Sequence, residues 1–342
     1  MRDARHLIRI TAILTALSLG LAACGGGDDN EGDDGSDEPK SVATEKDVPA
    51  TWPLTGLPVN GGGSAEQDHP VLVLKVDNTE ASAPQQGLSH ADLVVEELVE
   101  GGITRFAAFY YSDIPADVGP VRSIRASDIG IVTPVDGALV TSGGAPQTVK
   151  RVTDAGVQIF NESTPGFYRE STRSVPYNLF TDMGAVAKAA EDGKDALPAD
   201  YLPWGAEGDL PPGKPANTLT ADFGSHATNW TFQNGSYVNQ NSYAADGDEF
   251  PADSVLVLRV DVGDAGYKDA AGNPVPETIF EGTGNALLFH AGKVVEGSWS
   301  KDELSSALEL ETKDGKLKVP AGRVWIELVP VDAKGGSVTF GK

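Results

Sequence analysis

Residues 91–111 have the sequence ADLVVEELVEGGITRFAAFYY. Two runs rich in β-branched and aromatic residues, 91–100 and 103–111, are separated by Gly101-Gly102, a pattern that is typical of a β-hairpin. A third apolar run, VLVLKV at 71–76, ends at Asp77-Asn78 and predicts a buried strand. Three strands are therefore predicted between residues 71 and 111, with acidic side chains at or near their ends.

Outward from these strands, helical and strand patterns alternate as far as residue 205. Helices are predicted at 123–132, 146–155 and 183–192, and short strands at 138–141 and 157–160. The Pro- and Gly-rich segment 203–215 predicts a boundary, after which nearly every signal is strand or turn, as at 254–262, 285–288, 307–311 and 323–329. We expect an α+β protein, with a mixed α/β layered N-terminal domain at 49–205 followed by a β-rich C-terminal domain at 217–342.

The N-terminus has the pattern of a bacterial lipoprotein signal peptide, predicted at 1–23. Basic residues precede an apolar stretch at 10–21 that is too short for a stable membrane span. The stretch closes with Leu21-Ala-Ala-Cys24, which is similar to a lipobox, so Cys24 is the predicted lipidation site. An ordinary signal peptide that contains a cysteine is the alternative. Residues 24–48 are acidic with few apolar side chains, and predict a disordered tether between the lipid and the folded part.

Charge is distributed unevenly along the chain. The 342 residues include 26 Lys+Arg and 50 Asp+Glu, for a formal net charge of −24, which argues against a nucleic-acid partner. Arginine is nevertheless concentrated between residues 105 and 173, where most of it lies beside turns. A guanidinium group binds carboxylate or phosphate through two parallel hydrogen bonds, so we predict an anion-binding cluster. Its members are Arg105, Arg122, Arg125, Arg169 and Arg173, with Asp77, Asn78, Glu96 and Asn178 orienting them.

Two alternatives to this anion site remain open. The arginines could instead pair with Asp77, Glu96, Glu97, Glu100 or Asp128 in a buried network that stabilises the fold. A different class of function is a hydrolase or transferase acting on envelope glycans, with Asp77 and either Glu96 or Glu100 as the acid/base pair. Glu96 and Glu100 are an even number of residues apart, which predicts that they share one face of an extended strand.

Other catalytic signatures are missing from the sequence. Ser142-Gly-Gly lacks the surrounding nucleophile elbow, and the chain has neither a Walker loop nor a dinucleotide-binding fingerprint. The histidines are scattered singly, so no metal site is predicted, and no cofactor. We therefore favour a non-catalytic binding or assembly role.

Several motifs, in order along most of 53–342, resemble the YerB-like family of bacterial lipoproteins. They include Pro53-Leu-Thr-Gly-Leu-Pro58, Pro84-Gln-Gln-Gly-Leu-Ser89, Val99-Glu-Gly-Gly-Ile-Thr-Arg105, Gly119-Pro-Val-Arg-Ser-Ile-Arg125, Phe167-Tyr-Arg-Glu170 and Pro176-Tyr-Asn-Leu179, with Gly292–Trp299 and Gly322-Arg-Val-Trp-Ile326 late in the chain. The resemblance implies a lipoprotein with a two-part domain of unknown biochemical function, and it brings no established catalytic residues.

Three positions depart from the family pattern, because Ala83 replaces an arginine, Tyr177 replaces a histidine, and Tyr237-Val-Asn239 lacks an arginine. Each change removes a cation or a titrating group, so an anionic ligand should be held more weakly or elsewhere. The sequence as a whole predicts an extracytoplasmic protein anchored to the bacterial cell membrane through Cys24. Its expected partner is a cell-wall polymer or an envelope-assembly protein, and a purely structural adaptor is a further alternative.

Overall fold

The predicted hairpin is present in the computed structural model, which describes residues 50–191, 197–269 and 272–342. Strands β2 (Leu93–Leu98) and β3 (Thr104–Tyr110) run antiparallel, and Glu97 lies opposite Arg105. Gly101 and Gly102 make the turn at φ 75° and 72°, a left-handed conformation that glycine adopts without steric cost. Strand β1 (Leu72–Asn78) pairs with the other side of β3, so the three predicted strands are confirmed.

The remaining elements of the first 200 residues include the predicted helices and short strands, and a hairpin of β6 (Phe167–Arg169) and β7 (Leu179–Thr181) that was not predicted. The predicted ones are β4 (Ala138–Val140), β5 (Ile159–Phe160), α1 (Asp128–Val132), α2 (Pro146–Asp154) and α3 (Met183–Ala190). The predicted signal peptide, Cys24 and the tether lie outside the described residues.

The chain after residue 200 is almost entirely β-structure, as predicted. Its strands are β8 (Trp204–Gly205), β9 (Lys214–Pro215), β10 (Thr218–Asp222), β11 (Ala227–Gln233), β12 (Ser236–Asn239), β13 (Ser254–Lys268), β14 (Pro274–Ile279), β15 (Gly282–His290), β16 (Lys293–Lys301), β17 (Glu309–Thr312), β18 (Gly315–Lys316), β19 (Val319–Pro320), β20 (Val324–Pro330) and β21 (Ser337–Gly341). The fold is thus α+β, with a β-rich C-terminal part.

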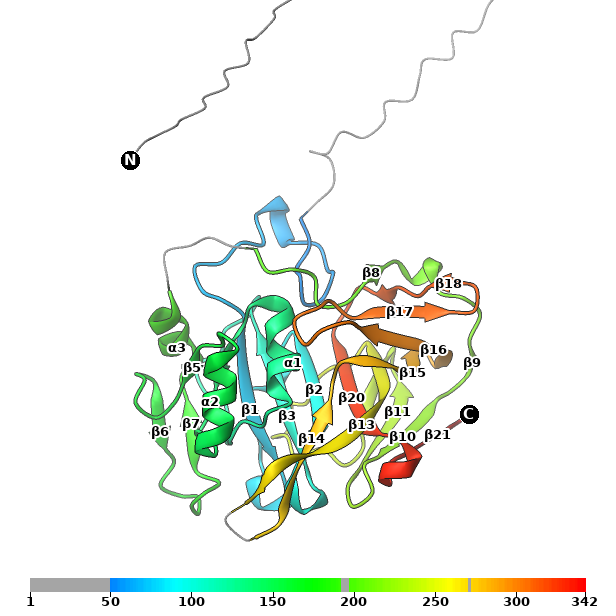
Figure 1. Ribbon diagram of the computed structural model, residues 1–342. Helices are drawn as coiled ribbons and strands as arrows, with labels where there is room; N and C mark the ends of the chain where they lie inside the picture. The colour runs from blue at the N-terminus through cyan, green and yellow to red at the C-terminus, as the bar shows by residue number, and fades with distance from the viewer. Residues whose placement is uncertain (1–49, 192–196, 270–271) are drawn as a thin grey trace, which may run out of the picture. The chain divides into compact units, whose positions relative to one another are not determined.

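One large mixed sheet joins the two parts of the chain (Figure 1). Its main path is β18-β17-β16-β15-β13-β20-β2-β3-β1-β4-β5, so β20, from near the C-terminus, lies between β13 and β2 and is parallel to both. All seven residues of β20 are buried, because both faces of the sheet are covered at this point. The described parts of the two predicted domains, from residue 50 to 205 and from 217 to 342, therefore share a sheet.

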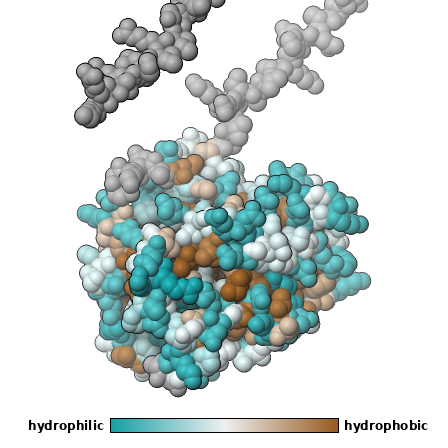
Figure 2. Space-filling model, viewed as in Figure 1, coloured by the Kyte–Doolittle hydropathy of each residue, from teal (hydrophilic) through white to brown (hydrophobic). Residues whose placement is uncertain are grey.

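Different layers cover the two faces of the sheet (Figure 1). On one face, α1 and α2 pack against it through residues such as Ile129, Val132 and Val152. On the other face lie α3 and a second sheet of order β12-β11-β10-β21, which contributes Leu219 and Trp230. In the view of Figure 2, hydrophilic residues cover most of the near face and apolar ones gather towards its middle. Within the described parts of the chain, no helix has the length and apolar character that crossing a bilayer requires.

The first predicted helix is shorter than expected. The sequence pattern predicts a helix from Ser123, but α1 begins only at Asp128. The side chain of Asp128 accepts a hydrogen bond from the backbone nitrogen of Arg125 (2.6 Å), which closes a turn before the helix. Residues 123–127 are consequently a loop that carries Arg125 towards the hairpin.

Candidate functional site

The predicted residues gather where the parallel strands end. Strand β4 is parallel to β1 and to β5, so the carboxyl ends of these strands lie at one edge of the sheet. The segment 120–122 lies between the ends of β1 and β4, since the Arg122 nitrogen donates to the Lys75 carbonyl (2.8 Å) and the Ser142 nitrogen donates to the Arg122 carbonyl (3.1 Å). In open α/β sheets, ligands bind outside the carboxyl ends of the strands. We call this region the carboxyl edge.

Arg122 is held in place at the carboxyl edge by two neighbours. Its Nε lies 2.6 Å from Oδ2 of buried Asp77, in an ion pair whose N–H is not aligned for a hydrogen bond. Its guanidinium carbon lies 5.3 Å from the centre of the Tyr177 ring. The Arg122 side chain is 18% exposed, and its two terminal nitrogens have no partner among the residues that the structure describes. Arg122 is therefore positioned by protein contacts and still has hydrogen-bond donors available.

Arg105 and Arg125 are instead buried around Glu100. Nε of Arg125 lies 2.7 Å from Glu100 Oε2, and its Nη2 pairs with Oε1. Nη1 of Arg105 donates to the Ser123 carbonyl (3.2 Å), and its Nη2 lies 3.6 Å from Glu100 Oε1. Burial and the charge of Arg125 lower the pKa of Arg105 to about 10. Burial would raise the pKa of Glu100, but Arg125 and Arg105 together lower it. These ion pairs correspond to the alternative of a buried network in which arginines pair with carboxylates and stabilise the fold.

A buried lysine on the same face completes this network and was not singled out from the sequence. Nζ of Lys75 lies 2.7 Å from both Glu97 Oε1 and Asp128 Oδ1, and all three side chains are fully buried. Burial opposes the charge of Lys75, but Asp128 and Glu97 raise its pKa above the ordinary value. The sequence signal is a single lysine inside the apolar run at 71–76. The ion pairs connect β1, β2 and α1.

The other two arginines lie on the β6–β7 hairpin. Arg169 pairs with Glu162 (2.5 Å) and donates to Asn178 Oδ1 (2.8 Å). Arg173 donates to the carbonyls of Ser82 (2.9 Å) and Pro84 (2.5 Å). Its guanidinium also lies over the Phe180 ring, 4.8 Å from the ring centre. The five arginines therefore form an inner group of three and an outer pair, each with its own partners.

The opposite face of the sheet carries a second polar cluster. Glu96, fully buried, accepts hydrogen bonds from Asn78 Nδ2 (3.2 Å) and Thr228 Oγ1 (3.0 Å), and lies 3.4 Å from Nε2 of His226. Burial opposes the charged form of His226, but the hydrogen bond to Glu96 and the negative charge of Glu96 raise the pKa of His226 above its ordinary value. Across the β2–β20 pair, Glu96 is in register with Glu327.

Glu327 is also fully buried, and its Oε1 accepts a hydrogen bond from Trp230 Nε1 (2.8 Å). Burial raises the pKa of Glu327 well above its ordinary value. The negative charge of Glu96 and a hydrogen bond to Glu96 raise this pKa further. A carboxyl group that keeps its proton beside a carboxylate relieves the repulsion between them. We call Glu96 and Glu327 the carboxyl pair.

The expectation that Glu96 and Glu100 share a face is wrong. Strand β2 ends at Leu98, and Glu100 lies in the turn Glu100–Gly102, where it meets Arg125. Asp77 lies in register with Arg105 and contacts Arg122, whereas Glu96 points to the opposite face and contacts Thr228. Asp77 and Glu96 are both completely buried. The three carboxylates thus do not face one open cleft, as a glycan hydrolase would require.

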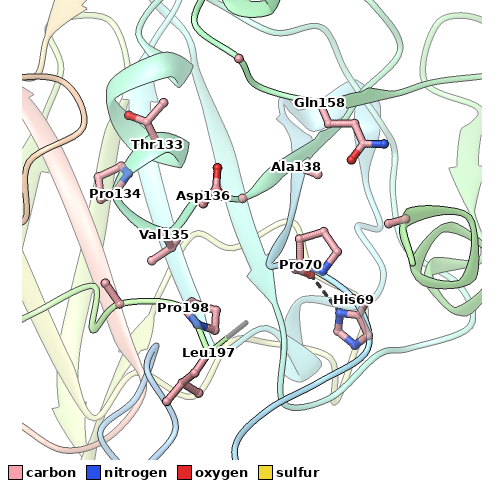
Figure 3. A pocket seen from close by; sticks show the side chains of 14 residues that line it. His69, Pro70, Thr133, Pro134, Val135, Asp136, Ala138, Gln158, Leu197 and Pro198 are labelled. Carbon is pink, nitrogen blue, oxygen red and sulfur yellow. Dashed lines mark hydrogen bonds between the residues drawn. The ribbon is translucent and has the colours of Figure 1, made fainter. Parts of the chain in front are cut away.

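One pocket lies away from the predicted residues. It has a volume of about 390 Å³ and is found at the amino ends of β1, β4 and β5, where Pro70, Ala138 and Gln158 line it (Figure 3). Its one histidine, His69, bonds through Nδ1 to the Pro70 carbonyl (2.9 Å). Across 50–191, 197–269 and 272–342, no group of three or more His, Cys, Asp or Glu side chains is placed to hold a metal ion.

Comparisons with known proteins define the class of protein. Residues 54–196 match the model of the DUF3048 N-terminal domain, and residues 218–326 match that of the DUF3048 C-terminal domain, both described as a protein of unknown function. The chain belongs to this family.

A relative and a solved structure agree with this assignment. The chain is 29% identical over 301 residues to a Bacillus subtilis (strain 168) protein named "Putative lipoprotein YerB", covering 85% of this chain and 89% of the relative. The crystal structure of YerB protein from Bacillus subtilis matches with a TM-score of 0.69 and 24% identity, over 84% of this chain and 99% of that chain. The latter similarity shows the fold.

Proposed function

We propose that this protein is a lipid-anchored, extracytoplasmic component of the cell envelope that binds an anionic group without catalysis. The lipobox at Cys24, together with the name of the Bacillus relative, supports a membrane anchor. The anionic group would be a phosphate or carboxylate, carried by a wall polymer or by a partner protein. In either case the protein would act as a tethered receptor or assembly factor.

The observation that carries this proposal is the state of Arg122. Two contacts fix its guanidinium, yet its terminal nitrogens are available at the carboxyl edge. Arg122 pairs with Asp77. Beside it, Arg105 and Arg125 pair with Glu100. With Lys75, Glu97 and Asp128, the network contains four cations and four carboxylates, so the carboxyl edge offers free hydrogen-bond donors and no surplus charge. An anion that accepts two hydrogen bonds from Arg122 would satisfy those donors.

The predicted roles of the other residues differ accordingly. Arg105 and Arg125 would support the site by their pairing with Glu100, and Asp77 would orient Arg122. Arg169 and Asn178 lie on the neighbouring hairpin, where they bond to each other. A glycan hydrolase is not favoured, because Glu96 lies on the opposite face of the sheet from Asp77. Asp77 is buried, and Glu100 is paired with arginines.

The test is binding of poly(glycerol phosphate) and of a polycarboxylate to the full-length protein in detergent, at two salt concentrations. A charge-assisted hydrogen bond contributes about 1.5–3 kcal/mol, so Arg122→Gln should weaken binding by about tenfold or more. Arg122→Lys should recover only part of the affinity, because lysine lacks the planar fork.

Arg151→Gln is the matched control, since Arg151 is exposed and forms a surface pair with Glu277. It should bind both polymers like the wild type. If Arg122→Gln binds them equally well, Arg122 does not hold the anion. If Arg122→Gln loses folding stability but no affinity, Arg122 belongs to the structural network alone.

A further inference from the structure

A separate pocket lies between the loop at 83–86 and the β6–β7 hairpin. Its volume is about 330 Å³, and its lining includes Gln86, Tyr168, Glu170, Arg173 and Phe180. Arg122 does not line it. Ligand pockets in proteins commonly span about 300–1,000 Å³, so this one has room for a small chemical unit.

An aromatic ring on the pocket is fixed in position. Tyr168 is 39% exposed, although large aromatic side chains are usually buried further. Its ring stacks on Phe180, with 6.1 Å between ring centres and an interplanar angle of 30°. Its hydroxyl donates to Asp117 Oδ1 (3.0 Å). Contacts at both the ring and the hydroxyl therefore hold an exposed aromatic group rigidly, which reduces the entropy lost when a ligand packs against it.

The polar side chains of the pocket combine acceptors and donors. Glu170 uses Oε1 to accept hydrogen bonds from the Thr172 nitrogen (3.1 Å) and hydroxyl (3.0 Å), and a carboxylate has further acceptor positions. The side-chain amide of Gln86 also has no partner there, and an amide both donates and accepts. Arg173 is fixed by the carbonyls of Ser82 and Pro84.

The charges of the pocket cancel each other. Glu170 and Arg173 are its two charged lining residues, and they carry opposite charges. An anion would be repelled by Glu170, and a cation by Arg173. A purely apolar ligand would leave the amide of Gln86 and the remaining acceptor positions of Glu170 without hydrogen bonds, which is costly once water is excluded. A neutral ligand rich in hydroxyl groups meets all of these conditions, because each hydroxyl both donates and accepts.

We propose that this pocket binds one neutral sugar ring, packed against Tyr168 and hydrogen-bonded by Glu170 and Gln86. A ring of this kind has apolar C–H groups that suit an aromatic surface and hydroxyls that suit the planar carboxylate and amide. The site goes beyond the anion site at Arg122 and does not depend on it. The site at Arg122 would bind an anionic group, and the pocket at Tyr168 would bind a neutral sugar.

The test is ligand-observed NMR titration of N,N′-diacetylchitobiose against the full-length protein in a zwitterionic, sugar-free detergent. Saturable binding in the millimolar range is expected for the wild type. Tyr168→Ala should weaken it at least tenfold, whereas Tyr168→Phe keeps the ring and should stay within about threefold of the wild type. Glu170→Gln, which keeps the shape of the side chain and removes its charge, should weaken binding severalfold. Glu309→Gln, a distant exposed carboxylate, should bind normally.

Three results would overturn the sugar site. The first is an absence of saturable binding in the wild type. The second is binding by Tyr168→Ala and by Glu170→Gln with the same affinity as the wild type. The third is displacement of the disaccharide by inorganic phosphate, which would make the pocket an anion site. Arg122→Gln separates this proposal from the proposed function, because it should bind the disaccharide normally while losing the anionic polymer. A negative result in the disaccharide experiment therefore leaves the anionic-polymer experiment interpretable, and the reverse is also true.

Discussion

Replacement of Glu327 by glutamine should remove the fall in folding stability that the buried carboxyl group of Glu327 causes as the pH rises. Glu327 and Glu96 are fully buried and in register across β2 and β20, and burial with the nearby Glu96 raises the pKa of Glu327. Glutamine keeps the shape of a protonated glutamate and can still accept the Trp230 hydrogen bond. Unlike glutamate, it releases no proton when the chain unfolds.

The sign and size follow from proton linkage. Below the ordinary glutamate pKa, both the native and the unfolded chain hold the proton, so stability does not change with pH. Above it, the unfolded chain releases the proton while native Glu327 retains it. The free energy of unfolding should then fall by about 1.4 kcal/mol for each pH unit, until the native carboxyl ionises. Because the pKa of His226 is also raised, His226 makes the free energy of unfolding fall further as the pH rises. This contribution is the same in the wild type and in Glu327→Gln, so it cancels in their comparison.

The assay is urea unfolding of the wild type and Glu327→Gln between pH 5 and 7. The stability of the variant relative to the wild type should increase by about 1.4 kcal/mol per pH unit. Glu309→Gln makes the same chemical change at an exposed residue and should show no such trend. A difference between the wild type and Glu327→Gln that stays constant with pH would refute the retained proton.

Other perturbations test the network, the turn, a helix and the anchor. Arg125→Ala leaves Glu100 without its main buried partner, so urea unfolding should show a loss of about 3–5 kcal/mol; a change below 1 kcal/mol, on the order of a surface pair, would contradict the buried network. Gly102→Ala should cost more stability than Gly101→Ala, because both glycines have positive φ but a Cβ at Gly102 alone would meet Ser225, at 2.6 Å; equal losses would argue against that close approach. Asp182→Ala removes hydrogen bonds to the first turn of α3 and should cost about 1 kcal/mol, whereas an unchanged melting temperature would mean that water replaces the cap. Cys24→Ser should move the protein from the membrane fraction to the soluble fraction on cell fractionation, and retention in the membrane would argue against a lipid anchor at this residue.

The strands near the site could be predicted because their apolar runs are long and end in charge. The hairpin of β2 and β3 follows from two such runs on either side of Gly101-Gly102, and β1 follows from the run that ends at Asp77. The concentration of arginine also predicted a cluster, and three of its five members, Arg105, Arg122 and Arg125, do lie together. Local pattern and composition are sufficient for these features.

Contacts between distant segments could not be predicted in this way. The pairing of β2 with β20 joins residues more than two hundred positions apart, and it alone brings Glu327 beside Glu96. The face of Glu100 was missed because parity along a strand holds only while the strand continues, and β2 ends at Leu98. The availability of Arg122, as opposed to Arg125, depends on which carboxylate each meets in three dimensions.

The most direct test of the anion site is NMR of the arginine side chains in the full-length protein labelled with ¹⁵N-arginine. Addition of poly(glycerol phosphate) should shift the side-chain signal of Arg122, identified by its absence in Arg122→Lys, and the shift should saturate. The signals of Arg105 and Arg125 should move little, because Glu100 already holds both. A saturating shift at Arg151 alone, or no shift at any arginine, would contradict an anion site at the carboxyl edge.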